Sequence, residues 1–231
     1  MPIHERMADV LPEKHVCDQL LRGYLEKHEA LYRVIHVPTF MREYNGYWDG
    51  TLASKAFLAK LLGILSRASR VETKSRGLGY ESSEGVYLPT ALALLRLWLN
   101  NLRGKQLVEL ETLQIELLWL LAMRTIKEDA RDGWAQLGSI MRMAMAMGLH
   151  RGPSEFGSRM TPFHGEMRRR LWATIADLDF YVSNDCNLPS LLREEDATTG
   201  PPWNLDDADL HPDMKELPPG NPLEQITDNH V

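Results

Sequence analysis

The chain has 231 residues, of which 44% are hydrophobic and 25% are charged, a composition typical of a soluble globular protein and not of a disordered one. Its two cysteines, Cys17 and Cys186, argue against a disulfide framework or a zinc site built from cysteine alone, and they favour a reducing, intracellular compartment. The longest apolar run, residues 117–123, is far shorter than the roughly 20 residues of a membrane span. We therefore expect no membrane association.

Charge divides the chain into two parts. Residues 194–231 carry ten acidic side chains, one basic side chain and six of the thirteen prolines, whereas residues 1–193 carry 25 basic and 22 acidic side chains. Prolines disfavour long helices, so the sequence predicts a helical domain over residues 1–193 and an acidic, proline-rich extended tail over residues 194–231. The nearly neutral body lacks the basic surface that a stand-alone DNA-binding domain presents to a duplex.

Apolar residues recur at helical spacing through most of the body, which predicts an all-α fold. The first helix is expected over about residues 13–33. The residue before a proline is pushed toward extended geometry, so Pro38 predicts a non-helical connector over residues 34–40. Asn45-Gly46 is a turn signal.

The next predicted helices cover residues 52–68, 90–102 and 107–127, with a polar, glycine-bearing loop over residues 74–85. Only four residues separate the last two helices, and Gly104 can end the first of them, so the two are expected to form an antiparallel pair. Successive pairs of this kind would build a multi-helix array. The helix over residues 107–127 is apolar nearly all round, which places it at the centre of the domain.

Residues 132–149 form a methionine-rich segment whose alternating methionines would share one face of a strand. The alanines, methionines and arginines of the segment favour a helix instead, with Asp132 as N-cap and Gly148 near its end. Thioether side chains adapt to varied apolar shapes, so one interpretation is a pliable ligand pocket, and the alternative is ordinary core filling. The candidate pocket residues are Met141, Met143, Met145 and Met147.

Another helix is predicted over residues 166–184, with one apolar stripe made by Leu171, Ile175, Leu178 and Val182. Three consecutive arginines, residues 168–170, could contact phosphate, but no further basic stretch extends them. The structural alternative pairs them with Glu166, with carbonyls at a neighbouring helix end, or with a carboxylate such as Asp179. We expect at least one of the three to be partly buried.

The sequence contains no recognisable catalytic or metal-binding motif. Its eight histidines show no H-E-x-x-H spacing, no glycine-rich phosphate loop occurs, and no serine stands in a nucleophile elbow. The pair His15 and Cys17 could hold a metal only with further ligands, and acidic pairs such as Asp206-Asp207 are too common to indicate acid–base chemistry. We therefore predict no catalytic, cofactor or metal residues in this chain and do not expect an enzyme.

Three stretches in the same order resemble the regulatory domain of fungal transcription factors, the middle homology region that accompanies a binuclear zinc cluster. The first, residues 32–40, contains a His-x-Pro-Thr-Phe turn, and the second, residues 134–151, ends in Gly-Leu-His-Arg. The third begins with Glu-Met-Arg-Arg-Arg-Leu-Trp at residues 166–172 and continues to residue 210, although Asn187-Leu188-Pro189 stands where Gly-Arg-Pro is usual. The motif residues to which the resemblance assigns structural roles are His36, Pro38, Phe40, Trp134, Gly148, Arg170, Trp172, Asp179 and Pro189.

The resemblance implies transcription regulation in the nucleus, with a metabolic or secondary-metabolite gene cluster as the controlled genes. A binuclear zinc cluster needs six cysteines, so DNA would be contacted only through a zinc-cluster domain that this chain lacks, and the chain itself would hold no cofactor. The resemblance also allows a homo- or heterodimer with related regulators and a small-molecule effector. The alternative is a stand-alone helical partner-binding protein, or a truncated regulator without its own DNA binding.

Overall fold

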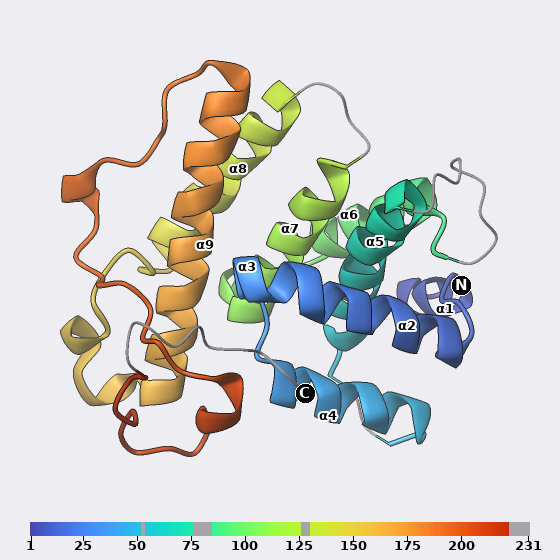
Figure 1. Cartoon of the computed structure of the whole chain (residues 1–231), viewed down its shortest axis with the longest axis horizontal. Coiled ribbons are helices and arrows are strands. Elements are labelled where there is room, and N and C mark those ends of the chain that lie inside the picture. Colours follow the sequence, from blue (N-terminus) through green and yellow to red (C-terminus); the bar gives the residue numbers. More distant parts are fainter. Residues whose placement is uncertain (52–53, 76–84, 126–129, 222–231) are drawn as a thin grey trace. The chain divides into compact units, whose positions relative to one another are not determined.

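The computed structural model describes residues 1–51, 54–75, 85–125 and 130–221. Every regular element in these ranges is helical, which confirms the all-α prediction (Figure 1). The α-helices are α1 Ile3–Asp9, α2 Lys14–Tyr24, α3 Ala30–Tyr32, α4 Val37–Trp48, α5 Phe57–Ser75, α6 Leu88–Asn100, α7 Leu110–Met123, α8 Ala130–Ala146 and α9 Pro162–Cys186. Within the described ranges, none of the helices combines the length and the apolar character needed to cross a membrane.

The chain divides into two compact units. Unit 1 consists of Met1–Glu29 and Thr39–Glu128, and unit 2 consists of Ala30–Pro38 and Asp129–Val231. The second unit therefore takes a short segment from the N-terminal part of the chain in addition to its C-terminal half. The proposed boundary between residues 193 and 194 stays a prediction.

Unit 1 is built around helix α5, which contacts α1, α2, α6 and α7. Helix α7 is buried along most of its length, and its side chains at Leu113, Ile115, Leu117, Leu118 and Leu120 are all 0% exposed. This burial confirms the central position that its apolar sequence predicts. The absence of a side chain at Gly63 allows α5 and α7 to approach closely. A Cβ at this position would lie only 2.9 Å from the Cβ of Leu118.

Helices α6 and α7 form the predicted antiparallel pair. The indole Nε1 of Trp119 donates to the carbonyl oxygen of Leu92 at 3.1 Å, and Arg96 Nη1 lies 3.2 Å from both carboxylate oxygens of Glu116. Rising residue numbers on α6 thus meet falling numbers on α7. Gly104 does not end α6, as the sequence predicted, because the C-cap of α6 is Asn101. Gly104 instead begins the short 3-10 turn Gly104–Val108 with a φ of +58°, a left-handed conformation that glycine adopts without strain.

Unit 2 contains two long helices, α8 and α9, which pack against each other. Helix α9 begins at Pro162 behind Thr161, whose side-chain oxygen accepts a hydrogen bond from the backbone N–H of His164. Its predicted apolar stripe is confirmed, since Leu171, Ile175, Leu178 and Val182 are all 0% exposed. The helix ends at Cys186 and is followed by Asn187, which has a left-handed φ of 54°; asparagine is a residue type that can replace glycine in this conformation.

Several predicted boundaries near the N-terminus are wrong. The helix expected over residues 13–33 is divided into α2, a π-helical turn at Leu25–Glu29 and α3, and the short helix α1 was not predicted. The connector expected over residues 34–40 ends early because α4 begins at Val37. Pro38 lies in the first turn of α4, where its missing N–H leaves no intrahelical hydrogen bond unmade.

Other boundaries also differ from the predictions. Asn45-Gly46 lies inside α4, and the left-handed glycine comes later, at Gly50 with a φ of +72°. Helix α5 begins at Phe57 instead of residue 52 and continues to Ser75, and residues 76–84 of the expected loop lie outside the described residues. Asp132 is not an N-cap, because α8 already begins at Ala130.

Candidate functional site

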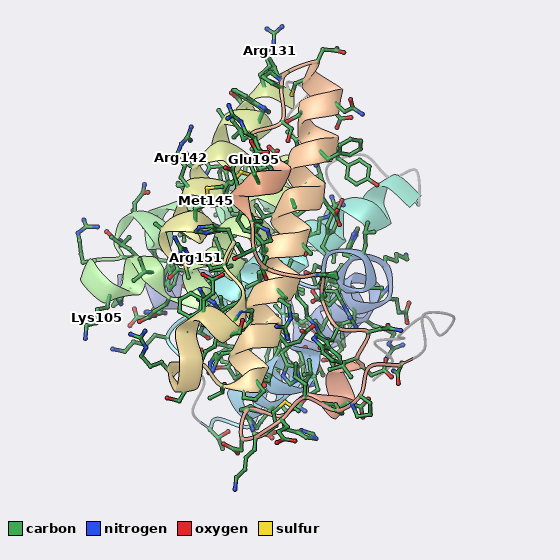
Figure 2. The ribbon with its side chains drawn as sticks, turned by 90° about the vertical axis from the view of Figure 1, so that its left-hand side faces the viewer. Lys105, Arg131, Arg142, Met145, Arg151 and Glu195 are labelled. Atoms are coloured by element: carbon green, nitrogen blue, oxygen red, sulfur yellow. The ribbon has the colours of Figure 1, made fainter. Side chains whose placement is uncertain are left out.

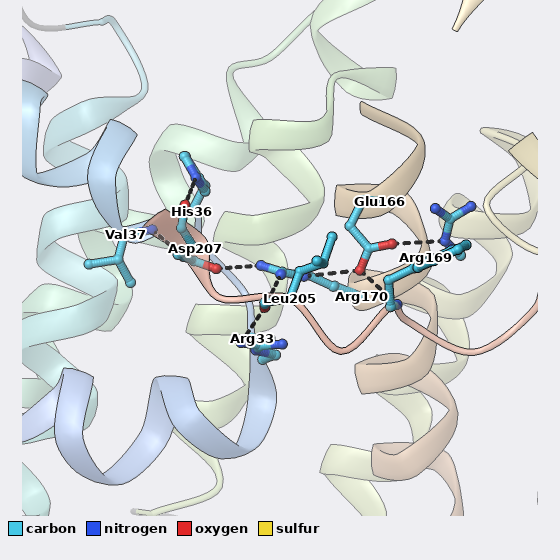
Figure 3. Close-up of polar contacts among 9 residues, drawn as sticks. Arg33, His36, Val37, Glu166, Arg169, Arg170, Leu205 and Asp207 are labelled. Atoms are coloured by element: carbon cyan, nitrogen blue, oxygen red, sulfur yellow. Dashed lines mark hydrogen bonds and ion pairs between the residues drawn. The ribbon is translucent and has the colours of Figure 1, made fainter. Parts of the chain in front are cut away.

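A buried polar cluster on helix α9 organises unit 2, and we call it the polar anchor (Figure 3). Its centre is Arg170, which is 1% exposed. The Arg170 guanidinium forms an ion pair with Asp207, and it donates to Glu166 Oε1 at 3.2 Å and to the carbonyl oxygen of Leu205 at 2.9 Å. Glu166 also accepts from the backbone N–H of Trp203 at 3.1 Å. Two carboxylates and one backbone carbonyl thus surround one buried cation, and the N–H of Trp203 satisfies one of the two carboxylates.

The short segment at residues 30–38 joins the polar anchor. The backbone N–H of Val37 donates to Asp207 Oδ2 at 2.7 Å, and His36 Nε2 lies 3.0 Å from the carbonyl oxygen of Asp207. Arg33 donates to the carbonyl oxygen of Leu205 at 3.2 Å. Burial lowers the pKa of His36, although the contacts with Asp207 oppose the shift. The cluster therefore fixes three segments that are far apart in sequence.

The three consecutive arginines have structural roles within unit 2. Arg169 pairs with Glu166 at 2.9 Å, and Arg168 donates to the carbonyl oxygen of Met147, just beyond the end of α8, at 2.6 Å. The predicted burial of at least one arginine is confirmed by Arg170. The expected pairing with Glu166 and with a carbonyl near a helix end is therefore confirmed. Asp179, the further carboxylate given as an example, is wrong as an arginine partner, because the additional carboxylate is Asp207.

Asp179 instead holds the chain segment that follows α9. Its side chain is 0% exposed, and its Oδ2 accepts from the hydroxyl of Ser190 and from the backbone N–H groups of Leu191 and Leu192, the last two at 2.9 and 3.2 Å. The carbonyl oxygen of Pro189 accepts from the indole of Trp134 on α8 at 3.2 Å. Helices α8 and α9 thus both hold the segment at residues 189–192.

The remaining motif residues lie in the two units as follows. In unit 2, Trp172 packs against His150 with ring centroids 5.9 Å apart, and Gly148 has a φ of +77°. In unit 1, the ring of Phe40 is 2% exposed and lies 5.7 Å from the ring of Phe57. Pro38 is exposed in the first turn of α4.

A cavity of 360 Å³ lies beside helix α8 in unit 2. Met141 and Met145 of the predicted methionine set line it, whereas Met143 and Met147 do not belong to its lining. Figure 2 shows Arg142 and Met145 on α8, with Glu195 on the segment beside them. The complete lining is Gly138, Met141, Arg142, Met145, His150, Leu191 and Asp196.

The two free cysteines have different environments. Burial raises the pKa of Cys17 to about 11, and its thiol donates to the carbonyl oxygen of Pro12 at 3.3 Å. A thiol with this pKa is largely protonated at neutral pH and is a poor nucleophile or metal ligand. Cys186 is partly exposed at the end of α9. Among the described residues, no group of three His, Cys, Asp or Glu side chains is arranged to hold a metal ion.

Sequence reasoning missed the partners that complete these sites. Asp207 stands among many acidic residues of the C-terminal segment, and nothing local distinguishes it from its neighbour Asp206. Gly138 and Arg142 could have been found, because each lies three or four residues from a cavity-lining methionine on the same helix. Leu191 lies beyond the end of α9 and carried no local signal.

Comparison with known families identifies the class of protein. Residues 21–218 match the family described as the fungal specific transcription factor domain, so the chain belongs to this family. The match covers both units and includes the polar anchor, Asp179 and the cavity. No solved structure shows significant similarity to the chain.

Several fungal transcription factors are similar to this chain in sequence. Transcription factor opdR of Penicillium oxalicum is 33% identical over 97% of this chain, and the match covers 28% of opdR. The Zn(2)-C6 fungal-type transcription factor mpsB of Macrophomina phaseolina is 30% identical over 96% of the chain and 30% of its own length. The Fusarisetin A cluster transcription factor fsa6 of a Fusarium species is 31% identical over 93% of the chain and 30% of its own length. The chain thus spans less than a third of each of these relatives.

Proposed function

We propose that the chain acts as the regulatory region of a nuclear transcription factor that controls a secondary-metabolite gene cluster. The observation that carries this proposal is the alignment of nearly the whole chain with transcription factors, one of which is named for such a cluster. The alternative of a stand-alone partner-binding protein is not favoured, because the relatives are themselves named transcription factors.

DNA contact is assigned to a zinc-cluster segment outside this chain. One relative is named as a Zn(2)-C6 fungal-type factor, and the cysteines of this chain do not fit such a metal centre. The chain has two cysteines, fewer than a binuclear cluster needs, and Cys17 is buried with a raised pKa. The role of the chain in this proposal is therefore regulatory, without catalysis and without direct reading of DNA sequence.

A reporter assay tests the regulatory role directly. The full chain is fused to an unrelated DNA-binding domain, with and without a strong activation segment, and reporter output is compared with that of the same proteins lacking the chain. We expect the chain to raise the output of the first fusion or to lower that of the second. Unchanged output in both formats, with the folded fusion present in the nucleus, would contradict the proposal.

The controlled genes require a second measurement in the source organism. Deletion of the coding sequence followed by transcript sequencing should alter a contiguous group of biosynthetic genes. Scattered changes without a contiguous group would contradict the assignment to a gene cluster but would leave a regulatory role intact.

A further inference from the structure

The cavity beside α8 combines an apolar floor with polar groups at its margin. Gly138, Met141 and Met145 stand at helical spacing on one face of α8, and Leu191 faces them from the segment after α9. The volume of 360 Å³ lies at the lower end of the roughly 300–1,000 Å³ range of small-molecule sites. Thioether side chains in such a floor adapt to ligand shape.

The side of the cavity opposite α8 is formed by Leu191, and a hydrogen bond to α9 fixes the backbone of this residue. The backbone N–H of Leu191 donates to the buried carboxylate of Asp179 at 2.9 Å. A side chain at Gly138 would place its Cβ 3.0 Å from Leu191 Cδ1 and 3.3 Å from Arg142 Nη1. Leu191 therefore forms a positioned wall of the cavity. The absence of a side chain at Gly138 lets Leu191 approach α8 and leaves room for the guanidinium of Arg142, one turn further along the same helix.

Two polar groups at the cavity lack partners. Arg142 is exposed and makes no hydrogen bond or ion pair with the described residues, and Nδ1 of His150 is buried without a hydrogen-bond partner among them. The one acid of the lining, Asp196, accepts from the backbone N–H of Arg193 at 3.3 Å in a short turn. An unpaired guanidinium and an unsatisfied imidazole nitrogen over an apolar floor match a carboxylate with an apolar body.

We infer that this cavity binds a small apolar carboxylic acid, with the carboxylate near Arg142 and His150 and the apolar body against Met141 and Met145. Binding of the acid can be measured on this chain and does not depend on the proposed function. Only an effect of the bound acid on transcription would rest on the proposed regulatory function. Because Leu191 is attached to Asp179 on α9, such a ligand would contact both helices α8 and α9 of unit 2, directly or through this segment.

The test uses 1-naphthoate as probe and its uncharged analogue 1-naphthamide as the matched control ligand. The full chain is labelled with 13C at its methionine methyl groups and titrated with each probe. We expect saturable shifts of the Met141 and Met145 signals with 1-naphthoate and no shift of Met7, which is 0% exposed in unit 1. Equal binding of the two probes, or no shift at the cavity methionines, would overturn the inference.

Two variants test whether the positive charge of Arg142 is needed to bind the carboxylate. Arg142→Gln should weaken 1-naphthoate binding about tenfold, since a charge-assisted hydrogen bond is lost, and should leave the weak binding of 1-naphthamide unchanged. Arg131→Gln is the matched control because Arg131 lies on the same helix, toward its other end from Met145, and does not line the cavity (Figure 2). An equal effect of both variants would show a non-specific charge effect and overturn the site.

A blocking variant tests the location independently of charge. Met145 is partly exposed, so Met145→Trp should preserve the fold, which the amide spectrum reports, while its larger side chain occupies the cavity. We expect loss of 1-naphthoate binding. Unchanged affinity in the folded variant would place the ligand elsewhere and overturn the inference. Loss of binding in Met145→Trp, together with unchanged reporter output from fusions of the unsubstituted chain, would leave the cavity assignment standing and contradict only the regulatory function.

Discussion

The two units bury charged groups in different structural settings. In unit 1, Lys60 on α5 contacts Glu43 on α4 and Glu111 on α7 at 3.2 and 2.6 Å, so its polar cluster joins residues of regular helices. In unit 2, Arg170 on α9 is paired with Asp207, in a segment that contains only short 3-10 turns. The comparison indicates that apolar packing already positions the helices of unit 1, whereas in unit 2 buried charge replaces secondary structure in positioning a chain segment.

The largest expected effect is the loss of the central cation of the polar anchor. Arg170→Met would leave Glu166 and Asp207 buried without their main partner, and we expect it to lower the free energy of unfolding by about 3–5 kcal/mol. Urea unfolding measures the loss, and amide hydrogen exchange should localise it to unit 2. Arg169→Met is the control, because Arg169 shares Glu166 as partner but is 11% exposed and lies outside the pair with Asp207. A loss as small as that of the control would contradict the central role of Arg170.

The second prediction concerns acid sensitivity, which the two units should show to different degrees. Burial, assisted by the charges of Arg67 and Lys27, lowers the pKa of His28 in unit 1 from 6.5 to about 4. The unfolded chain then binds the proton more readily than the folded chain between these pH values, so stability is highest above pH 6.5 and falls as the pH is lowered toward 4. For His28 we expect a loss of about 2 kcal/mol between pH 7 and pH 5.

Histidine variants separate the contributions to this pH dependence. His28→Gln should reduce the difference between urea unfolding at pH 7 and at pH 5, and His15→Gln is the control because the His15 side chain is 75% exposed. His36 in unit 2 also has a lowered pKa, but its contacts with Asp207 oppose the shift. Its replacement should therefore remove less of the pH dependence. An unchanged pH dependence in His28→Gln would contradict the prediction.

The third prediction returns to Lys60, the counterpart of Arg170 in unit 1. The Lys60 side chain is 7% exposed, but that of its partner Glu111 is 40% exposed and can be hydrated when the lysine is lost. Glu43 also accepts from the backbone N–H of Ser54 at 3.2 Å. Lys60→Met should therefore cost only about 2 kcal/mol, below the usual range for breaking a fully buried pair. A loss equal to that of Arg170→Met, measured by urea unfolding, would remove the distinction between the units.

The same distinction explains what the sequence could predict. Apolar periodicity identified the central position of α7 and the stripe of α9, because these depend on local spacing. It could not reveal that Asp207 pairs with Arg170, 37 residues away, since that contact depends on the path of an irregular segment. The π-helical turn was also missed. It follows Tyr24, whose hydroxyl donates to the buried carboxylate of Glu29 at 2.9 Å, a contact that no periodic pattern shows.

The cavity beside α8 was also predictable only in the part that depends on local sequence. The methionine-rich helix was recognised from composition, and the structure places two of its four candidate residues on the cavity. Gly138 and Arg142 lie on the same helix, whereas His150, Leu191 and Asp196 follow α8 or α9, so their place at the cavity depends on the three-dimensional path of the chain. Asp179 was singled out through the family resemblance, but its role in holding Leu191 follows only from the observed hydrogen bonds.

The smallest expected effect compares one glycine from each unit. Gly104 in unit 1 and Gly148 in unit 2 both have left-handed backbones, with φ of +58° and +77°, so an alanine at either position costs about 1 kcal/mol of backbone strain. A Cβ at Gly104 would meet no atom within 4 Å, whereas a Cβ at Gly148 would lie 3.0 Å from Cζ of Phe156.

Displacement of Phe156 would also disturb Arg168, whose guanidinium lies 5.2 Å from the centre of that ring and donates to the carbonyl oxygen of Met147. Gly148→Ala should therefore destabilise the protein by about 1 kcal/mol more than Gly104→Ala, a difference that thermal unfolding of the two variants can resolve. Equal losses would mean that Phe156 moves at no cost. The turn after α8 would then depend on backbone conformation alone, as the turn after α6 does, and the two units would differ only in how they bury charge.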